Sequence, residues 1–480
     1  MVSENIEHIS CDVLVVGGGP GGYVAAIRAS KLGKKVILVE ADRMGGTCLI
    51  RGCIPSKAII HAAGQYAKLQ TTSPHSVSEL GIDFSQPVKL DYAKTQGWKD
   101  SVVNQLSQGV EGLLKRAGVT VIKGWAKFHN AKACMVETKD ATNKIETLEL
   151  TAEHVILATG SKIMPLPSLP FGGKVIDSTE ALCLQTVPKT LAIIGAGYIG
   201  VELGLAYAKL GSKVSFVEMG DAILPSFDKQ LVRPVVASLK KYNVDIFLNS
   251  SAIGLNQNQQ LEIKSANDDI ISLDCDKILV TIGRQANLFG WGLEHMGVDL
   301  TDDKKFIKID NKCRTSMRNV WAIGDIVGEP MLEHKATTQG EIVSEIITGK
   351  TREFAPTSIA AICFTDPEIV SVGMTLQQAK DKNIEVKIGN FPFVANGRAL
   401  SQQMGGDGGF VRVIARADNH LILGIQAVGA HISELAGEFA LALEMSARLE
   451  DIADTIHAHP TMGEAFMESA MMALGEAIHI

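Results

Sequence analysis

Two cysteines five positions apart are the clearest reactive feature of this chain. Cys48 and Cys53 lie in the segment GGTCLIRGCIPSK. Such a pair can be a structural cross-link, part of a metal site or a redox couple. In a regular helix, Cα atoms five positions apart are about 9 Å from each other, which exceeds the limit of roughly 7 Å for a disulfide. A disulfide here therefore requires a distorted segment, and Gly45, Gly46, Gly52 and Pro55 can supply the distortion.

The other cysteines argue against a metal site or a network of structural disulfides. They occur singly along the chain: Cys11, Cys134, Cys183, Cys275, Cys313 and Cys363. Zinc needs further ligands, and the sequence has no second close cysteine pair and no spaced Cys/His cluster. We therefore expect no metal. Sparse cysteine usage is typical of a reducing compartment, where a close pair is more often catalytic than structural. Two unrelated buried thiols remain an alternative at this point.

Two glycine-rich segments each read as a strand, a tight turn, a helix and a second strand. They span residues 11–40 and 190–218. Their Gly-x-Gly-x-x-Gly glycines are Gly17, Gly19 and Gly22, then Gly195, Gly197 and Gly200. These glycines allow a tight turn, close approach to a diphosphate and packing of helix on strand, while the helix N-terminus attracts phosphate. Glu40 and Glu218 follow at equal distances and are placed to bind a ribose. Because Glu218 has no arginine after it, NAD is favoured over NADP.

The rest of the chain predicts an α/β protein with an additional C-terminal domain. Strands entering glycine turns are expected in residues 155–167, 278–287 and 320–343, with Asp325 at the last turn. After about Thr351, runs of strands are followed by helices, which indicates an α+β domain. The predicted fold is two Rossmann-like dinucleotide-binding domains plus a C-terminal α+β domain. The predicted boundaries are 1–153, 154–283, 284–352 and 353–480.

Composition excludes several classes of protein. The 480 residues are 46% hydrophobic and 21% charged, with a formal net charge of -7. No run of Lys and Arg stands out, which argues against a nucleic-acid partner or a membrane surface. The first ten residues, MVSENIEHIS, resemble neither a secretory signal nor a transit peptide. We therefore expect a cytoplasmic protein. The longest apolar run, from Leu191, contains glycines and Glu202 and does not predict a membrane span.

Several motifs together carry a resemblance to a known family. They occur in the order VVGGGPGGYVAA, GGTCLIRGCIPSK, GAGYIGVELG, TIGRQAN, WAIGDI and HAHPTMGEAF. The chain resembles the pyridine nucleotide-disulfide oxidoreductases over essentially its whole length. Within them it is most similar to the branch that reoxidises dihydrolipoyl groups for the 2-oxo acid dehydrogenase complexes. Two departures, CLIRGC without the usual asparagine and GRQAN without the usual proline, change no atom that the chemistry requires.

The resemblance implies a mechanism based on Cys48 and Cys53 as a redox disulfide. A dihydrolipoyl thiol attacks Cys48 while His459 takes its proton, and Cys53 is released as a thiolate beside the flavin. The second substrate thiol then releases oxidised lipoyl, and electrons pass through FAD to NAD+. Glu464 is implied to orient the His459 ring, as in other oriented bases.

The resemblance also implies where the cofactors bind. Residues 1–153 would bind FAD, residues 154–283 would bind NAD, and residues 284–352 would complete the FAD site. Glu40 would bind the FAD ribose, Asp325 the ribityl chain and Glu218 the NAD ribose. Lys57 would lie beside the flavin and pair with Glu202. The remaining implied cofactor contacts, besides the six motif glycines, are Gly46, Thr47, Thr159, Gly160, Gly283, Arg284, Gly324, Met331 and Leu332.

The implied assembly is a homodimer formed by residues 353–480, in which His459 and Glu464 serve the partner's cysteines. The implied partners are dihydrolipoamide and the E2 acyltransferase core, or a lipoyl-bearing protein, of a 2-oxo acid dehydrogenase or glycine-cleavage complex. Two other hypotheses stay open. A glutathione reductase-like enzyme would prefer NADPH, which Glu218 disfavours, and a non-catalytic E2-docking subunit would be expected to lack some of the four catalytic residues. A mercuric reductase or larger thioredoxin reductase would need cysteines after Cys363.

Overall fold

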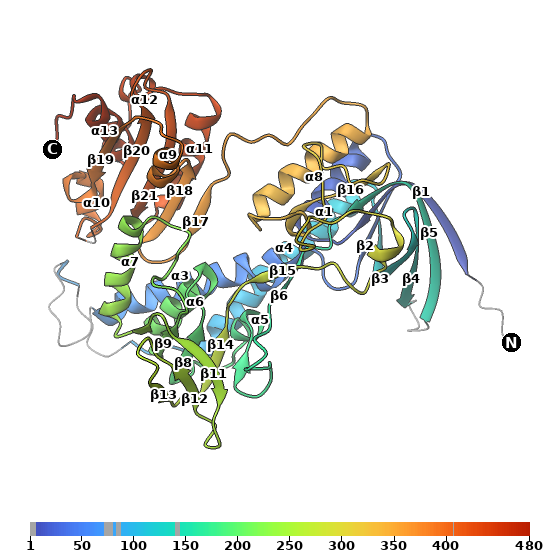
Figure 1. Ribbon diagram of the computed structural model, residues 1–480, viewed down its shortest axis with the longest axis horizontal. Helices are drawn as coiled ribbons and strands as arrows, with labels where there is room; N and C mark the ends of the chain where they lie inside the picture. Colours follow the sequence, from blue (N-terminus) through green and yellow to red (C-terminus); the bar gives the residue numbers. More distant parts are fainter. Residues whose placement is uncertain (1–5, 72–79, 83–87, 140–144, 407) are drawn as a thin grey trace.

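The computed structural model describes residues 6–71, 80–82, 88–139, 145–406 and 408–480. Residues 1–5, part of the segment used for the targeting prediction, lie outside the described residues. Figure 1 shows the sheet that contains β1 and β5 at one end of the molecule and the C-terminal sheet at the other. The sheet that contains β8 and β9 lies below and between them.

The first sheet contains the first glycine-rich unit, and the predicted strand–helix–strand order is confirmed. Its strands are β1 (Glu7–Val16), β2 (Val36–Glu40), β3 (Thr120–Asn130), β4 (Ala133–Lys139), β5 (Ile145–Leu157) and β16 (Val320–Ala322). Helix α1 (Pro20–Lys31) connects β1 to β2, which pair in parallel. Strand β5 pairs in parallel with both β1 and β16. The antiparallel pairing of β4 with β3 and β5 was not predicted from the sequence.

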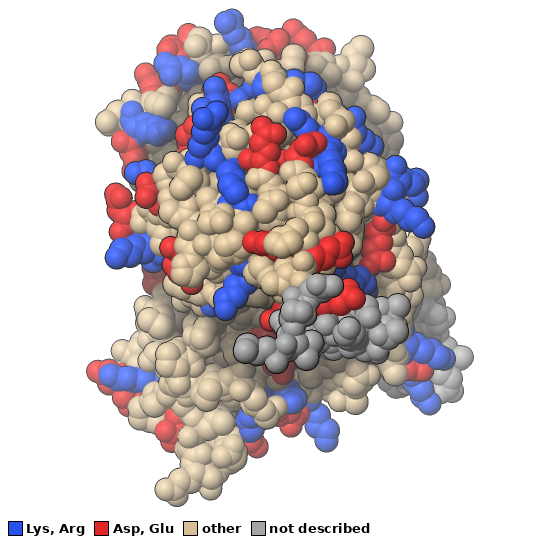
Figure 2. Space-filling view, turned by 90° about the vertical axis from the view of Figure 1, so that its right-hand side faces the viewer, with Lys and Arg blue, Asp and Glu red and all other residues tan. Residues whose placement is uncertain are grey.

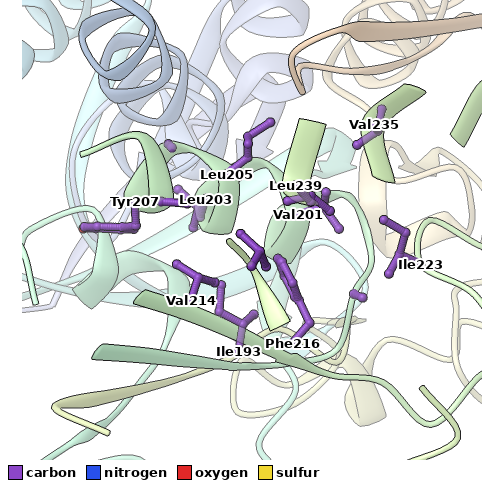
Figure 3. Packing of buried hydrophobic residues seen from close by; sticks show 14 of the residues in the cluster. Ile193, Val201, Leu203, Leu205, Tyr207, Val214, Phe216, Ile223, Val235 and Leu239 are labelled. Carbon is purple, nitrogen blue, oxygen red and sulfur yellow. The ribbon is translucent and has the colours of Figure 1, made fainter. Parts of the chain in front are cut away.

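The second sheet contains the second glycine-rich unit, which is also confirmed. Its elements are β7 (Val175–Ile176), β8 (Thr190–Ile194), α6 (Tyr198–Lys209), β9 (Lys213–Val217), α7 (Lys229–Lys241), β10 (Asp245–Phe247) and β14 (Lys277–Val280). The five parallel strands lie in the order β10-β9-β8-β14-β7. Apolar side chains of α6, α7 and the strands interdigitate, including Val201, Leu239 and Phe216 (Figure 3). A Cβ on Gly204 would lie 2.4 Å from the Phe216 ring, so α6 packs directly on the sheet.

Short antiparallel strands extend these two units. A three-stranded sheet consists of β11 (Ser251–Leu255), β12 (Leu261–Lys264) and β13 (Ile270–Leu273). Strands β6 (Ser161–Ile163) and β15 (Arg284–Ala286) pair with each other where the chain passes between the first and second sheets (Figure 1). The 3-10 helices are η1 (Leu293–His295), η2 (Gly324–Val327), η3 (Phe393–Ala395) and η4 (Ile432–Leu435).

Five further helices lie around the first two sheets. They are α2 (Gly46–Arg51), α3 (Cys53–Thr71), α4 (Tyr92–Arg116), α5 (Ser178–Ala181) and α8 (Glu333–Ile347). Helix α8 packs closely on α1, because a Cβ on Gly340 would lie 2.5 Å from the Gly21 carbonyl oxygen. Helix α3 packs against α6. These contacts bring the segment that contains Cys48 and Cys53 close to both glycine-rich units.

The C-terminal domain is an antiparallel sheet covered by helices, as the expected α+β class requires. Its strands are β17 (Ala361–Cys363), β18 (Glu368–Gly373), β19 (Val386–Pro392), β20 (Phe410–Arg416) and β21 (Ile422–Gly429), in the order β17-β18-β21-β20-β19. Its helices are α9 (Leu376–Asp381), α10 (Gly397–Ser401), α11 (Ala436–Glu444), α12 (Leu449–Ala453) and α13 (Glu464–Leu474). The strands are therefore interrupted by α9 and α10, which the sequence pattern did not predict.

Surface charges of both signs are mixed on the face shown in Figure 2. Basic and acidic side chains alternate there over short distances, and neither sign gathers into one large patch. Within the described residues, no helix combines the length and apolar character needed to cross a bilayer.

Candidate active site

The two cysteines form a disulfide at a break between two helices. Helix α2 ends at Arg51, and α3 begins at Cys53. Between them Gly52 has a φ of -139° and a ψ of -109°, which no regular helix contains. The break brings the Cα atoms of Cys48 and Cys53 to 4.7 Å, and their sulfurs are bonded. The distortion predicted from the five-residue spacing is confirmed.

The disulfide lies on the wall of a cavity of about 380 Å³, a volume within the range of roughly 300–1,000 Å³ for ligand pockets. Predicted site residues from several segments line it: Gly17, Gly19, Gly22, Glu40, Gly46, Thr47, Cys48, Cys53, Lys57, Thr159, Gly160, Glu202, Arg284, Gly324, Asp325 and Met331. Other predicted residues do not: Gly195, Gly197, Gly200, Glu218, Gly283, Leu332, His459 and Glu464. The cavity thus joins the disulfide to the first glycine turn and to the turn at Asp325.

The first glycine turn has the shape needed to hold a diphosphate. A Cβ on Gly17 would lie 2.2 Å from the Ala158 carbonyl oxygen, and one on Gly46 would lie 2.5 Å from the Gly19 Cα. Only glycine fits at such close approaches. Gly19 caps α1, whose first turn has no acidic residue, and the start of α1 lines the cavity. Backbone N–H groups at a helix start favour an anion, so this wall fits the diphosphate of a dinucleotide.

Glu40 lies beside the first glycine turn. Its carboxylate accepts hydrogen bonds from the Gly18 N–H at 2.5 Å and from the Asp42 N–H at 2.8 Å. Burial raises the pKa of Glu40, and the backbone N–H groups of Gly18 and Ala41 and the charge of Arg51 oppose that rise. The carboxylate is therefore fixed at the end of β2, where it can accept hydrogen bonds from a ribose.

Asp325 lines the same cavity and belongs to a hydrogen-bonded group. Ser161 donates its hydroxyl to Asp325 at 2.5 Å, and Arg284 donates from Nε to the Ser161 hydroxyl at 2.8 Å. Burial lowers the pKa of Arg284, and Asp325 counteracts this effect. The Asn287 N–H donates to the Gly160 carbonyl at 2.9 Å. Strands β6 and β15 therefore hold this part of the wall in place.

Lys57 and Glu202 connect the disulfide segment to the second glycine-rich unit. The Lys57 ammonium lies 2.8 Å from Glu202 Oε2, so the predicted pair is confirmed as a contact. The other carboxylate oxygen accepts a hydrogen bond from the Phe364 N–H at 2.8 Å, and the Lys57 ammonium lies 4.5 Å from the Phe364 ring centroid. Phe364 follows β17 of the C-terminal domain, so three parts of the chain meet here.

The second glycine turn repeats the arrangement of the first. A Cβ on Gly195 would lie 2.7 Å from the Thr281 carbonyl oxygen. Glu218 accepts from the Ala196 N–H and from the Gly220 N–H, both at 2.7 Å, which matches the two backbone contacts of Glu40. This turn lies outside the lining of the cavity, although Tyr198, at the start of α6, is part of that lining. The second turn therefore lies outside the cavity of the first, and helix α6 is an element of the second unit that reaches that cavity.

His459 and Glu464 form a second pair, on the C-terminal domain. The His459 Nδ1 lies 2.8 Å from Glu464 Oε1, and the Thr461 N–H donates to Glu464 Oε2 at 2.7 Å. Burial acts to raise the pKa of Glu464, but the Thr461 N–H and the His459 ring hold it below its ordinary value. The His459 side chain is 79% exposed. Within one chain this pair does not reach the cavity of the cysteines.

Several residues near the cavity were missed by the sequence reasoning. Arg51, Trp125, Ser161 and Tyr198 line it, and Phe364 contacts Lys57. Tyr198 and Arg51 lie inside recognisable motifs and could have been found from their positions. Ser161 directly follows the predicted contacts Thr159 and Gly160. Trp125 and Phe364 are brought in by β3 and by the segment after β17, and no motif marked them. Among the described residues, no cluster of three His, Cys, Asp or Glu side chains could hold a metal.

Comparison with known families identifies the protein class. The model of the pyridine nucleotide-disulphide oxidoreductases matches residues 11–340, and the dimerisation domain of the same family matches residues 359–470. The chain belongs to the pyridine nucleotide-disulphide oxidoreductase family. This family uses FAD and NAD.

The chain is also similar to individual proteins over nearly its whole length. A dihydrolipoyl dehydrogenase of Pseudomonas aeruginosa is 50% identical over 474 residues, covering 99% of this chain and 100% of the relative. Another, of Geobacillus stearothermophilus, is 44% identical, covering 98% of each chain. The solved structure of LpdA from Mycobacterium tuberculosis matches with a TM-score of 0.85 at 25% identity, covering 96% of this chain and 99% of that one. Each of these three matches covers nearly the whole length of both this chain and the relative.

Proposed function

We propose that the protein catalyses the dihydrolipoyl dehydrogenase reaction, in which a dihydrolipoyl group is oxidised to lipoyl and NAD+ is reduced. The observation that carries this proposal is the Cys48–Cys53 disulfide on the wall of the cavity that contains the first glycine turn. A disulfide beside a dinucleotide site can accept two electrons from a dithiol and pass them on. The full-length similarity to proteins named dihydrolipoyl dehydrogenase supports a dihydrolipoyl group as the dithiol.

The residues of the cavity would hold FAD. The glycines of the first turn, with Gly46 and Thr47, would bind its diphosphate, and Glu40 would bind its adenosine ribose. We assign the ribityl chain to Asp325. The other proposed contacts with FAD are Lys57, Thr159, Gly160, Arg284, Gly324, Met331 and Leu332. The chemistry supplied by bound FAD would be the transfer of the electron pair of the reduced cysteines, as a hydride, to NAD+.

NAD would bind at the second glycine turn. The proposed contacts are Gly195, Gly197, Gly200, Glu202, Glu218 and Gly283. The Glu218 carboxylate accepts two backbone hydrogen bonds and is followed by the exposed Met219. A 2′-phosphate at this position would approach a carboxylate without a counter-charge beside it in the sequence, which favours NAD over NADP.

The cysteines are proposed to act in a fixed order. A substrate thiolate attacks Cys48 and forms a mixed disulfide, so that the Cys48–Cys53 bond breaks and Cys53 leaves as a thiolate. His459 removes the proton of the attacking thiol, because only the thiolate is the nucleophile. The second substrate thiolate then attacks the substrate sulfur of the mixed disulfide, so that lipoyl is released and Cys48 leaves as a thiolate, which takes up the proton held by His459.

A homodimer would bring the two catalytic pairs together. His459 is exposed and does not line the cavity of its own chain, while residues 359–470 match the dimerisation domain of the family. We propose that His459 and Glu464 of one subunit serve Cys48 and Cys53 of the other. We further propose that the dimer docks on the E2 core or a lipoyl-bearing protein of a 2-oxo acid dehydrogenase or glycine-cleavage complex, in the cytoplasm.

A pair of assays tests the proposed function. Purified protein loaded with FAD is given dihydrolipoamide with NAD+, and separately NADPH with oxidised glutathione. We expect NADH formation in the first assay and little NADPH consumption in the second. Turnover in the second assay alone would show a glutathione reductase-like enzyme, and turnover in neither would favour a docking subunit.

A further inference from the structure

Arg51 lies within the loop closed by the disulfide, and its side chain lines the cavity. One end of its guanidinium group forms an ion pair with the Asp42 carboxylate. Its Nε is shielded from solvent and has no hydrogen-bond partner among the described residues. A buried donor without an acceptor is unfavourable, because it has lost its hydrogen bonds to water. A bound molecule with an acceptor at this position would satisfy it.

The other cations on the cavity wall differ from Arg51. Lys57 pairs with Glu202, and Arg284 donates to Ser161. Arg43 donates from Nη2 to the Asn104 side chain at 2.7 Å. In the part of the chain that the structure describes, Arg51 is the one cavity-lining cation with a shielded donor that lacks a partner.

A chain of contacts places Arg51 at the first glycine turn. Its partner Asp42 donates its N–H to Glu40 Oε1 at 2.8 Å, and Gly18 donates its N–H to Glu40 Oε2 at 2.5 Å. Arg51 is close enough for its charge to act on Glu40. The guanidinium group is therefore held near the region where the shape of the turn and the start of α1 favour a diphosphate and a ribose.

We propose that Arg51 binds the adenosine diphosphate half of FAD, with Nε donating to a diphosphate oxygen. This inference rests on the proposed assignment of FAD to the cavity. The planar guanidinium group can bind a carboxylate with one edge while another donor contacts a phosphate. Asp42 holds the group in the required orientation. The segment that contains the reactive cysteines would then itself contribute to cofactor binding.

The test measures binding of three probes to the full-length chain from which FAD has been removed: FAD, ADP and riboflavin. For Arg51→Met we expect the Kd of FAD and of ADP to rise roughly ten- to hundredfold, the effect of losing a charged hydrogen bond. Riboflavin, which has no diphosphate, should bind as it does to the wild type. Arg51→Lys, which keeps the charge but lacks Nε, should recover only part of the affinity.

Two control variants distinguish this contact from other effects. Arg43→Met removes a neighbouring cation whose Nη2 already has a partner, and Asp42→Asn removes the ion pair but leaves Nε. Both should bind ADP several times more tightly than Arg51→Met. The inference is overturned if the Kd of ADP for Arg51→Met is unchanged, or if Arg51→Met loses affinity for riboflavin alone. It is also overturned if either control variant loses as much affinity for ADP as Arg51→Met does. If the wild-type chain does not bind FAD, the proposed function itself fails.

Discussion

Lys57 and Glu202, which are far apart in the sequence, form an ion pair between α3 and α6 with a distance of 2.8 Å. The Glu202 side chain is 4% exposed and the Lys57 side chain 32%. Both carboxylate oxygens are occupied, since the second one accepts from the Phe364 N–H. The pair therefore joins the redox segment, the second glycine-rich unit and the C-terminal domain at one point.

Replacing Glu202 with Gln should destabilise the protein by about 2 kcal/mol. Removing one member of a buried ion pair leaves the other charge uncompensated, and the partial exposure of Lys57 reduces the effect below the full value for a buried pair. The free energy of unfolding in urea measures it. Glu294→Gln, at an exposed carboxylate, is the control and should change the value by less than about 0.5 kcal/mol. Equal values for the two variants would contradict a stabilising role of the pair.

Replacing each of the two cysteines with serine should give variants that differ in their absorbance spectra. Cys48→Ser should lose turnover with dihydrolipoamide while Cys53 remains able to form a thiolate, which gives a long-wavelength absorbance band beside oxidised flavin. Cys53→Ser should lose both the turnover and the band. Absorbance spectra of the FAD-loaded variants between pH 5 and pH 9 provide the measurement. The band appearing in Cys53→Ser instead of Cys48→Ser would reverse the proposed order of the two sulfurs.

Much of the site could be predicted because its chemistry depends on local spacing. The first and second glycine turns each place three glycines and a later acid within one strand–helix–strand unit. The distance between two cysteines in an ideal helix predicted that a disulfide needs a distorted segment, and the structure places the distortion at Gly52. The Lys57–Glu202 contact was implied by family resemblance and is present in the structure.

The remaining features depend on contacts between distant segments. The Phe364 N–H reaches Glu202 only because β17 ends beside α6, and the ring of Phe364 contacts Lys57 for the same reason. Helix α4 was not predicted, although its buried Lys99 connects the first unit to the second by donating to the Leu182 carbonyl at 2.8 Å. The contact of a buried lysine such as this one depends on tertiary packing, and hydrophobic periodicity in the sequence does not predict it. Arg51 had no assigned role until its pair with Asp42 was seen.

Two neighbouring histidines offer a matched test of the acid–base assignment. His459→Ala should lower kcat with dihydrolipoamide about 10²- to 10⁴-fold, because general acid–base groups contribute this much. His457, two positions earlier, pairs instead with Glu438 at 3.2 Å, and its side chain is 8% exposed. We expect His457→Ala to retain kcat within about threefold of the wild type, because His457 is not the proposed general base and its removal leaves His459 in place. Steady-state assays of both variants decide the matter, and similar losses in the two would argue against His459 as the specific base.

Glu464 should contribute stability that disappears in acid. Its folded-state pKa is below its ordinary value, because the lowering effects of the Thr461 N–H and the His459 ring outweigh the raising effect of burial. The unfolded chain then binds a proton more readily than the folded one, so the contribution is fully present above the ordinary pKa and is lost as pH falls through the lower folded-state pKa. Glu464→Gln has no such carboxylate. The difference in the free energy of unfolding between the wild type and Glu464→Gln should therefore shrink as the pH is lowered from 7 to 3, as measured by urea titrations. A difference that stays constant over this range would mean that the charged form of Glu464 has no preferential interaction in the folded state.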